Sequence, residues 1–115
     1  MKTTALRSLF AVFVLLLPFS QVFAQPFDGS VAAGEEKAAP CAACHGMDGD
    51  GILPEYPNIG GQYADYLYRT LKAYQSGERA NAIMAGQVSR LSDRDLRDLA
   101  AYYAAQDGLY VPRKD

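Results

Sequence analysis

Two cysteines and a histidine near the middle of the chain have the types and spacing that attach a cofactor covalently. Cys41, Cys44 and His45 form a C-x-x-C-H string, and the 115 residues contain no other cysteine or histidine. Residues three apart on a helical turn face the same way, so both sulfurs can bond the two vinyl groups of one porphyrin. His45 then lies where an imidazole nitrogen can bind the haem iron. The string therefore predicts one haem c, joined to the chain through both thiols.

The same two cysteines allow three other interpretations. They could form a disulfide in an oxidising compartment, and a thioredoxin-like redox pair has the same C-x-x-C spacing. A pair of that kind follows a strand in a βαβ unit, and no segment here alternates with a period of two. A zinc site needs a fourth ligand, and no further cysteine or histidine exists to supply it. Covalent haem is the favoured interpretation, and a Cys41–Cys44 disulfide is the main alternative.

The iron of a histidine-bound haem has a sixth position, which a methionine, another side chain or nothing can fill. Met47 lies only two residues after His45, too near in the chain to reach the opposite face of a ring. Met84 lies in a segment of small residues, 81–86, that can run close over a flat surface. A core methionine that fills a gap is the alternative. The upstream haem motif and the long loops that need a surface favour Met84 as a ligand.

Helical patterns precede and follow the motif, and none of the chain has the pattern of a strand. Good helix formers occupy residues 31–39, and we expect Pro40 to end that helix just before the cysteines. An apolar stripe at helical spacing predicts a second helix over about 62–76, with Gly77 as its C-terminal cap. The motif therefore lies between two predicted helices.

A third predicted helix and two long loops complete the chain. The helix follows Ser92, a good N-cap residue, and its apolar side chains repeat at helical spacing until Gly108. Segments 46–61 and 77–91 are predicted to be loops. Loops of more than about 12 to 15 residues in so short a chain need a surface to pack on, and a bound cofactor supplies one. We therefore predict an all-α domain in which three main helices wrap around one haem.

Charged and aromatic side chains have less specific interpretations. Three arginines alternate with three aspartates around the third helix: Arg90, Asp93, Arg94, Asp95, Arg97 and Asp98. This alternation predicts an exposed helix face with ion pairs. The eight tyrosines are expected to fill a thin core, with hydroxyls that reach water or a haem propionate. Arg79 and Gln62 are candidates for propionate contacts, and solvated residues at helix ends are the alternative for both.

The N-terminal segment, residues 1–24, has the pattern of a secretory signal peptide. A basic start precedes an apolar run over 9–19 and a small-residue cleavage site that ends at Ala24. The run is far shorter than the about 20 apolar residues that cross a bilayer. Cleavage leaves a domain of residues 25–115 and changes the net charge from −2 to −4, because two cations are lost. We expect a soluble periplasmic domain that neither inserts in a membrane nor has the basic surface that nucleic acids require.

The motif and several later segments resemble the class I c-type cytochromes, and most of all the small bacterial monohaem proteins similar to single domains of exported dihaem cytochromes. The matching segments are 41–46, 56–62, 77–79, 83–84, 91–93 and 99–103. The first is specific for attached haem, whereas the others match the family by their order and spacing. A single C-x-x-C-H motif, where the dihaem relatives have two, implies a single haem.

This resemblance implies roles for residues outside the motif. Met84 corresponds to the distal iron ligand, and Pro57 to the residue whose carbonyl accepts a hydrogen bond from the iron-binding histidine. Gly34 corresponds to the small residue at which the first and last helices cross, against Tyr102 or Tyr103. A glycine there lets the two backbones approach closely.

These features together predict a one-electron carrier and not an enzyme. With His45 and Met84 in both axial positions, the iron has no open site for a substrate, and no nucleophile lies beside a base. The expected partners are redox proteins that meet an exposed haem edge in a brief contact. Two alternatives stay open: an electron-accepting subunit of an exported dehydrogenase complex, and a gas or redox sensor in which Met84 leaves the iron easily.

Overall fold

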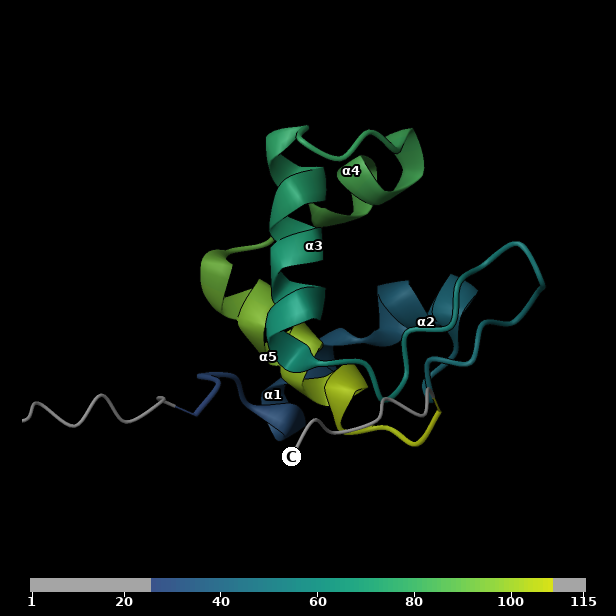
Figure 1. The fold of residues 1–115 in the computed structure, drawn as a ribbon, viewed down its shortest axis with the longest axis vertical. Coiled ribbons are helices and arrows are strands. Elements are labelled where there is room, and N and C mark those ends of the chain that lie inside the picture. Colours follow the sequence, from purple (N-terminus) through teal and green to yellow (C-terminus); the bar gives the residue numbers. More distant parts are fainter. Residues whose placement is uncertain (1–25, 109–115) are drawn as a thin grey trace, which may run out of the picture.

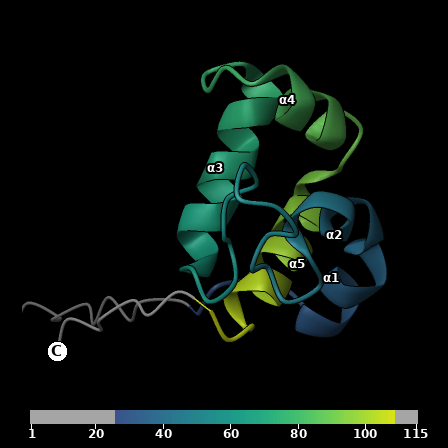
Figure 2. The same cartoon turned by 90° about the vertical axis from the view of Figure 1, so that its right-hand side faces the viewer.

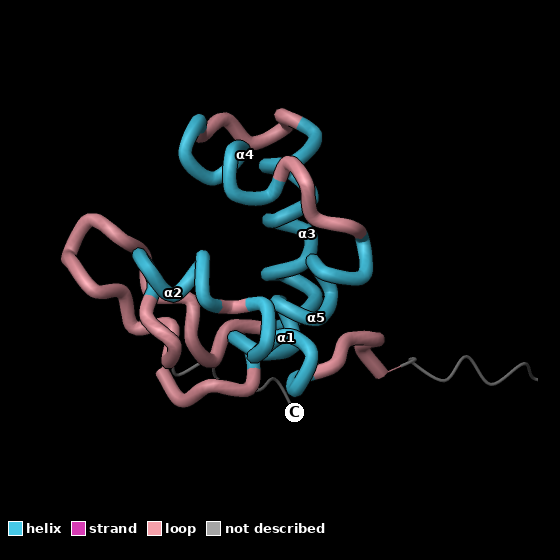
Figure 3. The backbone as a smooth tube through the Cα atoms, turned by 180° about the vertical axis from the view of Figure 1, so that it is seen from behind, coloured by secondary structure: helices cyan, strands magenta, loops and turns pink. Residues whose placement is uncertain are grey.

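The computed structural model describes residues 26–108, which form five helices and no strand (Figures 1 and 3). The helices are α1 (Val31–Lys37), α2 (Ala39–His45), α3 (Ala64–Ser76), α4 (Ala82–Val88) and α5 (Asp93–Ala104). The predicted signal peptide, residues 1–24, lies outside the described residues. The all-α prediction is confirmed, and two short helices add to the three that were predicted.

The helices are arranged around α5. This helix contacts both α1 and α3, while α3 also contacts α4, and α1 leads directly into α2. Figures 1 and 2 show α4 beside the end of α3 that lies away from α1, with α2 and the loop after it to one side. The helix that carries the C-x-x-C-H string and the helix that carries Met84 are therefore separate elements of the fold.

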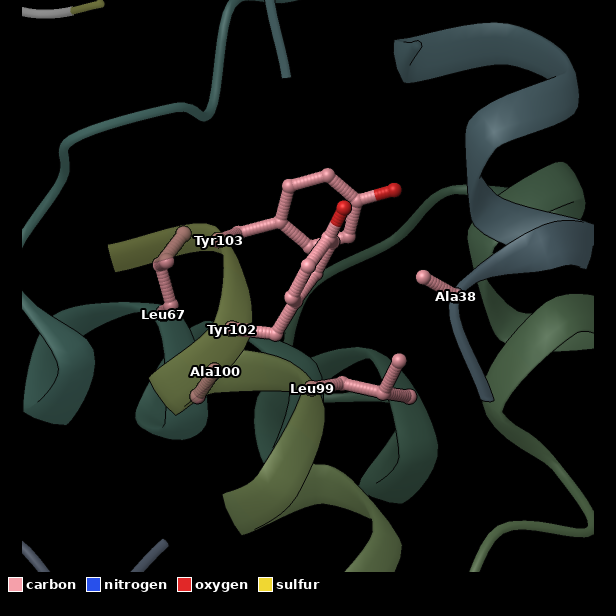
Figure 4. Packing of buried hydrophobic residues seen from close by; sticks show 6 residues of the cluster. All are labelled: Ala38, Leu67, Leu99, Ala100, Tyr102 and Tyr103. Carbon is pink, nitrogen blue, oxygen red and sulfur yellow. The ribbon is translucent and has the colours of Figure 1, made fainter. Parts of the chain in front are cut away.

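Side chains of α5 make up most of the apolar core (Figure 4). The buried cluster consists of Leu99, Ala100, Tyr102 and Tyr103 from α5, Leu67 from α3, and Ala38 from the junction of α1 and α2. The rings of Tyr102 and Tyr103 meet edge to face, with centroids 5.1 Å apart, a favourable arrangement for aromatic pairs. The predicted apolar stripe of the third helix is thus confirmed as its buried face.

Gly34 lies where α1 crosses α5, as the family resemblance implied. A Cβ atom at this position would overlap the backbone carbonyl oxygen of Asp98 and come within 2.6 Å of the Cβ of Tyr102. The two helix backbones can therefore approach this closely only because position 34 has no side chain. The contact joins the N-terminal part of the described chain to its C-terminal helix.

The boundary between the first two helices differs from the prediction. We expected residues 31–39 to form one helix that Pro40 ends, but α1 ends at Lys37 and Pro40 lies in the first turn of α2. Proline is tolerated there because the first N–H groups of a helix have no partner within it. The same residue that was expected to end one helix therefore begins the helix that carries the cysteines.

The caps of α3 and α5 are as predicted. Gly77 follows α3 in the left-handed conformation, with a φ of 80°, which glycine adopts without steric cost. Ser92 caps α5 by accepting a hydrogen bond from the backbone N–H of Asp95, whose side chain in turn accepts one from the backbone N–H of Ser92. This reciprocal capping box fixes the first turn of α5.

The segment 77–91 was predicted to be a loop, but it contains the helix α4. Asn81 begins the helix, because its side-chain oxygen accepts a hydrogen bond of 3.0 Å from the backbone N–H of Met84. The helix is only seven residues long and includes Gly86, which lowers its intrinsic helix propensity. Tertiary contact with α3 outweighs that weak propensity.

The charged residues of α5 do not all face solvent, which corrects the prediction of an exposed ion-paired face. Asp98 is only 2% exposed. Its carboxylate accepts hydrogen bonds from the backbone N–H of Ser30 at 2.9 Å and from the Lys37 ammonium at 2.8 Å, and it pairs with the Arg94 guanidinium at 3.1 Å. Asp98 therefore ties the start and end of α1 to α5, next to the Gly34 crossing.

We expect Asp98→Asn to lower the free energy of unfolding by about 2 kcal/mol near neutral pH, because it leaves two cations without their shared partner. The hydrogen bond from Lys37 holds the pKa of the Asp98 carboxyl below its ordinary value of 3.8. The stability it adds is therefore complete above about pH 4 and is lost as the pH falls through the lower folded pKa. Thermal melts from pH 7 downward should show a gap between wild type and variant that narrows only below about pH 4.

The matched control for this prediction is Asp65→Asn. Asp65 pairs with Arg69 on the exposed side of α3, where both side chains are more than half exposed, so its loss should change the melting temperature little. A gap between wild type and Asp98→Asn that stays constant down to the lowest pH at which the wild type is folded would contradict the assignment.

Candidate haem-binding site

One cavity draws its walls from α2, α3, α4, α5 and the loop that follows α2. Its apolar lining includes Ile59, Leu67, Leu71, Val88, Leu91, Leu99 and Ala100. No acidic side chain lines it, and its lining contains a single arginine. Such a lining suits a flat, largely apolar cofactor that is held by a few polar groups.

The structure brings four of the five predicted site residues to this one cavity. Cys41 and His45 line it from α2, Pro57 from the loop, and Met84 from α4. Cys44 is half-buried on α2 and does not contribute to the lining. Met47, which is too near His45 in the chain to bind the opposite face of a haem, is 46% exposed and lies outside the lining.

His45 is buried and held by one hydrogen bond. Its Nδ1 lies 2.9 Å from the carbonyl oxygen of Pro57. A carbonyl can only accept, so Nδ1 donates its proton, and in the neutral imidazole the other ring nitrogen, Nε2, then keeps its lone pair. The imidazole is therefore fixed in the tautomer that a metal ion requires, and this contact is the one that the family resemblance implied for Pro57.

Backbone hydrogen bonds in the loop 46–61 explain how Pro57 reaches the histidine. The backbone N–H groups of Ile59 and Gly60 both donate to the carbonyl of Gly49, at 2.7 and 3.1 Å, and the N–H of Gly51 donates to the carbonyl of His45 at 2.7 Å. Gly49 has a φ of 81°, and a Cβ there would lie 2.5 Å from the Gly60 nitrogen. The loop thus folds back on itself at a glycine that no other residue could replace without strain.

Two buried tyrosines of α5 hold the segment that directly follows the histidine. The Tyr103 hydroxyl donates to the carbonyl of Gly46 at 3.1 Å, and the Tyr102 hydroxyl donates to the carbonyl of Met47 at 2.8 Å. Burial raises the pKa of both hydroxyls, so both stay protonated donors. Their hydroxyls were expected to reach water or a propionate; instead they bind the backbone beside His45.

The two cysteine thiols are free and lie one turn apart on α2. Cys41 and Cys44 therefore do not form the alternative disulfide in this structure. Burial raises the pKa of the Cys41 thiol, which is unlike the lowered pKa of a reactive thiolate in a redox pair. A half-buried, protonated thiol beside an apolar cavity fits a sulfur that forms a thioether bond.

The residues present fit one covalently held haem. The groups that could bind it are two sulfurs at C-x-x-C spacing, an imidazole whose Nε2 is free to bind a metal, and a methionine from another helix. The walls of the cavity contain no carboxylate. A hard divalent cation would prefer oxygen ligands, and this lining supplies no acidic oxygen. Fold and site together define the class of protein: a small all-α haem protein.

Comparison with known proteins gives the family. The cytochrome c family model matches residues 31–105, which is most of the described chain, and the chain belongs to the cytochrome c family. With one C-x-x-C-H motif, it carries one covalent haem c, and like its homologues it is an electron-transfer protein and not an enzyme. These findings confirm the predicted fold class, family and cofactor.

The matched relatives differ in length. The chain is 49% identical over 82 residues to cytochrome c-554(548) of Halomonas halodenitrificans, with 69% of this chain and 99% of that protein aligned. It is 45% identical over 78 residues to cytochrome c4 of Pseudomonas aeruginosa, with 68% of this chain but 39% of that protein aligned. The chain therefore spans nearly all of the first relative and about two fifths of the second.

A solved structure supports the same relationship. Reduced recombinant cytochrome c4 from Pseudomonas stutzeri matches with a TM-score of 0.67 and 38% sequence identity, over 70% of this chain and 47% of that one. The chain thus corresponds to about half of that larger protein. This structural match confirms the all-α architecture of a class I cytochrome.

Proposed function

We propose that the chain is a soluble periplasmic one-electron carrier, whose haem is joined to Cys41 and Cys44 and has His45 and Met84 as axial ligands. The observation that carries this proposal is that His45 and Met84 come from separate helices, α2 and α4, and line one apolar cavity. With His45 and Met84 both bound to it, the iron of a haem held here would have no site left for a substrate, and its chemistry would be limited to electron transfer.

The side chains of the cavity orient and shield the cofactor. When bound, the haem supplies an iron that gains or loses one electron. The Pro57 carbonyl holds His45 in one orientation and increases the basicity of Nε2. The thioether of Met84 is a weak donor, and the apolar walls disfavour extra positive charge, so both features stabilise the reduced state and raise the potential.

The proposed location follows from the N-terminal segment. A signal peptide of residues 1–24, cleaved after Ala24, would deliver residues 25–115 to the periplasm, outside the cytoplasm, where haem is attached to C-x-x-C-H motifs. Within residues 26–108, no helix has the length and apolar character needed to span a bilayer. Mass spectrometry of the exported protein should give a chain that begins at Gln25.

Other redox proteins are the proposed partners. We expect them to meet an exposed haem edge over a small interface, below about 1,200 Å², which suits fast dissociation after transfer. The acidic mature chain, with a net charge of −4 after loss of the two signal-peptide cations, favours partners with a basic surface over nucleic acids.

The alternative function is an electron-accepting subunit of an exported dehydrogenase complex. A relative from Thiomonas intermedia, 40% identical over 76 residues, is a thiosulfate dehydrogenase electron acceptor, and 35% of its length is aligned. Fold and ligands would be the same in both cases. Purification of the tagged chain from its own cells separates them, because a subunit brings a catalytic chain with it at stoichiometric yield and a free carrier does not.

The test of the proposed function is spectroscopy of the wild-type protein after expression with export and haem attachment. We expect a coloured protein whose haem stays bound after denaturation, a methionine–iron charge-transfer band in the oxidised state, and a one-electron redox titration. The reduced protein should not bind carbon monoxide at neutral pH. Colourless protein would overturn the haem assignment, and rapid carbon monoxide binding would instead support the sensor alternative.

A further inference from the structure

We propose that Arg79 binds a carboxylate of the haem at the mouth of the cavity, and that its charge raises the reduction potential of the iron. The inference rests on the proposed function and adds to it a residue that determines how the cofactor is oriented and tuned. It is carried by the position of Arg79, its lack of an acidic partner and the way its side chain is held.

Arg79 lies at the boundary between the cavity and the protein surface. It is the one cation in the lining, and that lining contains no aspartate or glutamate. It also lines a second, more open hollow, which borders the first and has Arg69 and Glu78 in its walls. A cofactor with an apolar ring and carboxylates at one edge would place the ring against the inner walls and the carboxylates at such a boundary.

Most other cations in residues 26–108 already have acidic partners. Arg69 pairs with Asp65, Arg94 with Asp28 and Asp98, Arg97 with Asp93, Lys37 with Asp95 and Asp98, and Lys72 with Asp93. Among these described residues, Arg79 and Arg90 have no ion pair, and of the two only Arg79 lines the cavity. No acidic side chain lines the cavity, so the N–H groups of the Arg79 guanidinium are available to a ligand.

The local structure holds the Arg79 side chain in place. After the left-handed Gly77, the backbone N–H of Arg79 donates to the carbonyl of Ala73 at 3.0 Å, so the residue is anchored to the last turn of α3. The guanidinium carbon lies 5.0 Å from the centre of the Tyr74 ring, a cation–π distance. Tyr74 lines the same cavity, so it supports the guanidinium at the rim before any ligand is bound.

The chemistry of the rim favours a carboxylate as the partner. A guanidinium matches a carboxylate with two parallel N–H···O bonds, which the neutral polar residues of the lining, such as Gln62, cannot do. The attraction between a carboxylate and a charged donor is stronger beside an apolar wall than in bulk water. Because oxidation adds one positive charge to the iron, a nearby fixed cation disfavours the oxidised state and raises the potential.

The test compares three variants of the haem-loaded protein: Arg79→Gln, Arg79→Lys and the control Arg69→Gln. Arg69 borders the outer hollow but not the cavity, and it is paired with Asp65. We expect Arg79→Gln to shift the reduction potential to lower values and to shift the propionate-bending bands of the resonance Raman spectrum. Arg79→Lys should restore most of the potential, because it keeps the charge, and Arg69→Gln should leave both measurements at their wild-type values.

The possible results separate this proposal from the proposed function. An Arg79→Gln protein with the wild-type potential and wild-type Raman bands would overturn the Arg79 proposal. A lower potential with unshifted propionate bands would also overturn it, because that result indicates a structural or long-range effect and no contact with the carboxylate. Thermal melts confirm that each variant is folded. If wild-type protein lacks covalent haem or the methionine–iron band, the proposed function fails before any Arg79 variant is compared.

Discussion

Replacing Met84 with alanine should leave the haem covalently attached and convert the reduced protein into one that binds carbon monoxide at neutral pH. Met84 lines the cavity from α4, whereas the cysteines and His45 lie on α2, so the change removes the proposed second iron ligand without touching the attachment site. The methionine–iron charge-transfer band should disappear. The potential should fall by on the order of 0.1 V, within the roughly 0.8 V range that axial ligands control.

Met47→Ala is the matched control for this prediction. Met47 is 46% exposed, lies two residues from His45 and does not line the cavity, so its loss should change neither the spectrum nor carbon monoxide binding. Met84→His is a useful third variant, because a second imidazole would fill the sixth position and exclude carbon monoxide again at a lower potential. Retention of the charge-transfer band in Met84→Ala would show that Met84 is not the ligand.

The haem assignment could be made from the sequence because its determinants are local. Two thiols and an imidazole within five residues fix their own relative positions once the segment is helical, so Cys41, Cys44 and His45 needed no tertiary information. The caps of α3 and α5 were equally local, since Gly77 and Ser92 act on the backbone next to them. Features of this kind can be predicted directly from residue type and spacing.

Features that depend on tertiary contacts could not be read in this way. The helix α4 has a weak intrinsic propensity and forms against α3, so the sequence predicted a loop around Met84. Asn81, a good N-cap residue directly before four helix-compatible residues, was the one local signal that could have revealed it. Asp98 looked like an exposed residue because its partners Ser30 and Lys37 lie more than 60 positions away in the chain.

The resemblance to a family supplied what neither spacing nor propensity could. Pro57 and Gly34 act through partners 12 and 64 positions away, His45 and Asp98, and no pattern in the sequence marks either pair. The structure contains both contacts, one as a hydrogen bond to the proposed iron ligand and the other as a helix crossing. The second contact leads to the largest stability effect expected for a single substitution in this domain.

Gly34→Ala should lower the free energy of unfolding by about 3 kcal/mol, the upper end of the usual cost of an overpacked site. The added Cβ would overlap the carbonyl oxygen of Asp98, a backbone atom in the middle of α5 that cannot rotate away as a side chain can. Relief requires α1 to move from α5, which would also break the bonds of Asp98 to Ser30 and Lys37. In a domain of this size, such a loss lowers the melting temperature by roughly 12 °C or more.

Gly86→Ala tests whether the effect comes from the crossing and not from any loss of glycine. Gly86 lies within the helix α4, and a Cβ there would meet no atom within 4 Å. Alanine at that position should therefore stabilise the protein by about 0.5 to 1 kcal/mol through its higher helix propensity. Opposite signs for the two substitutions are the expected result. A Gly34→Ala protein that melts within a few degrees of wild type would show that α1 and α5 can separate freely, and that the haem, more than this contact, holds the domain together.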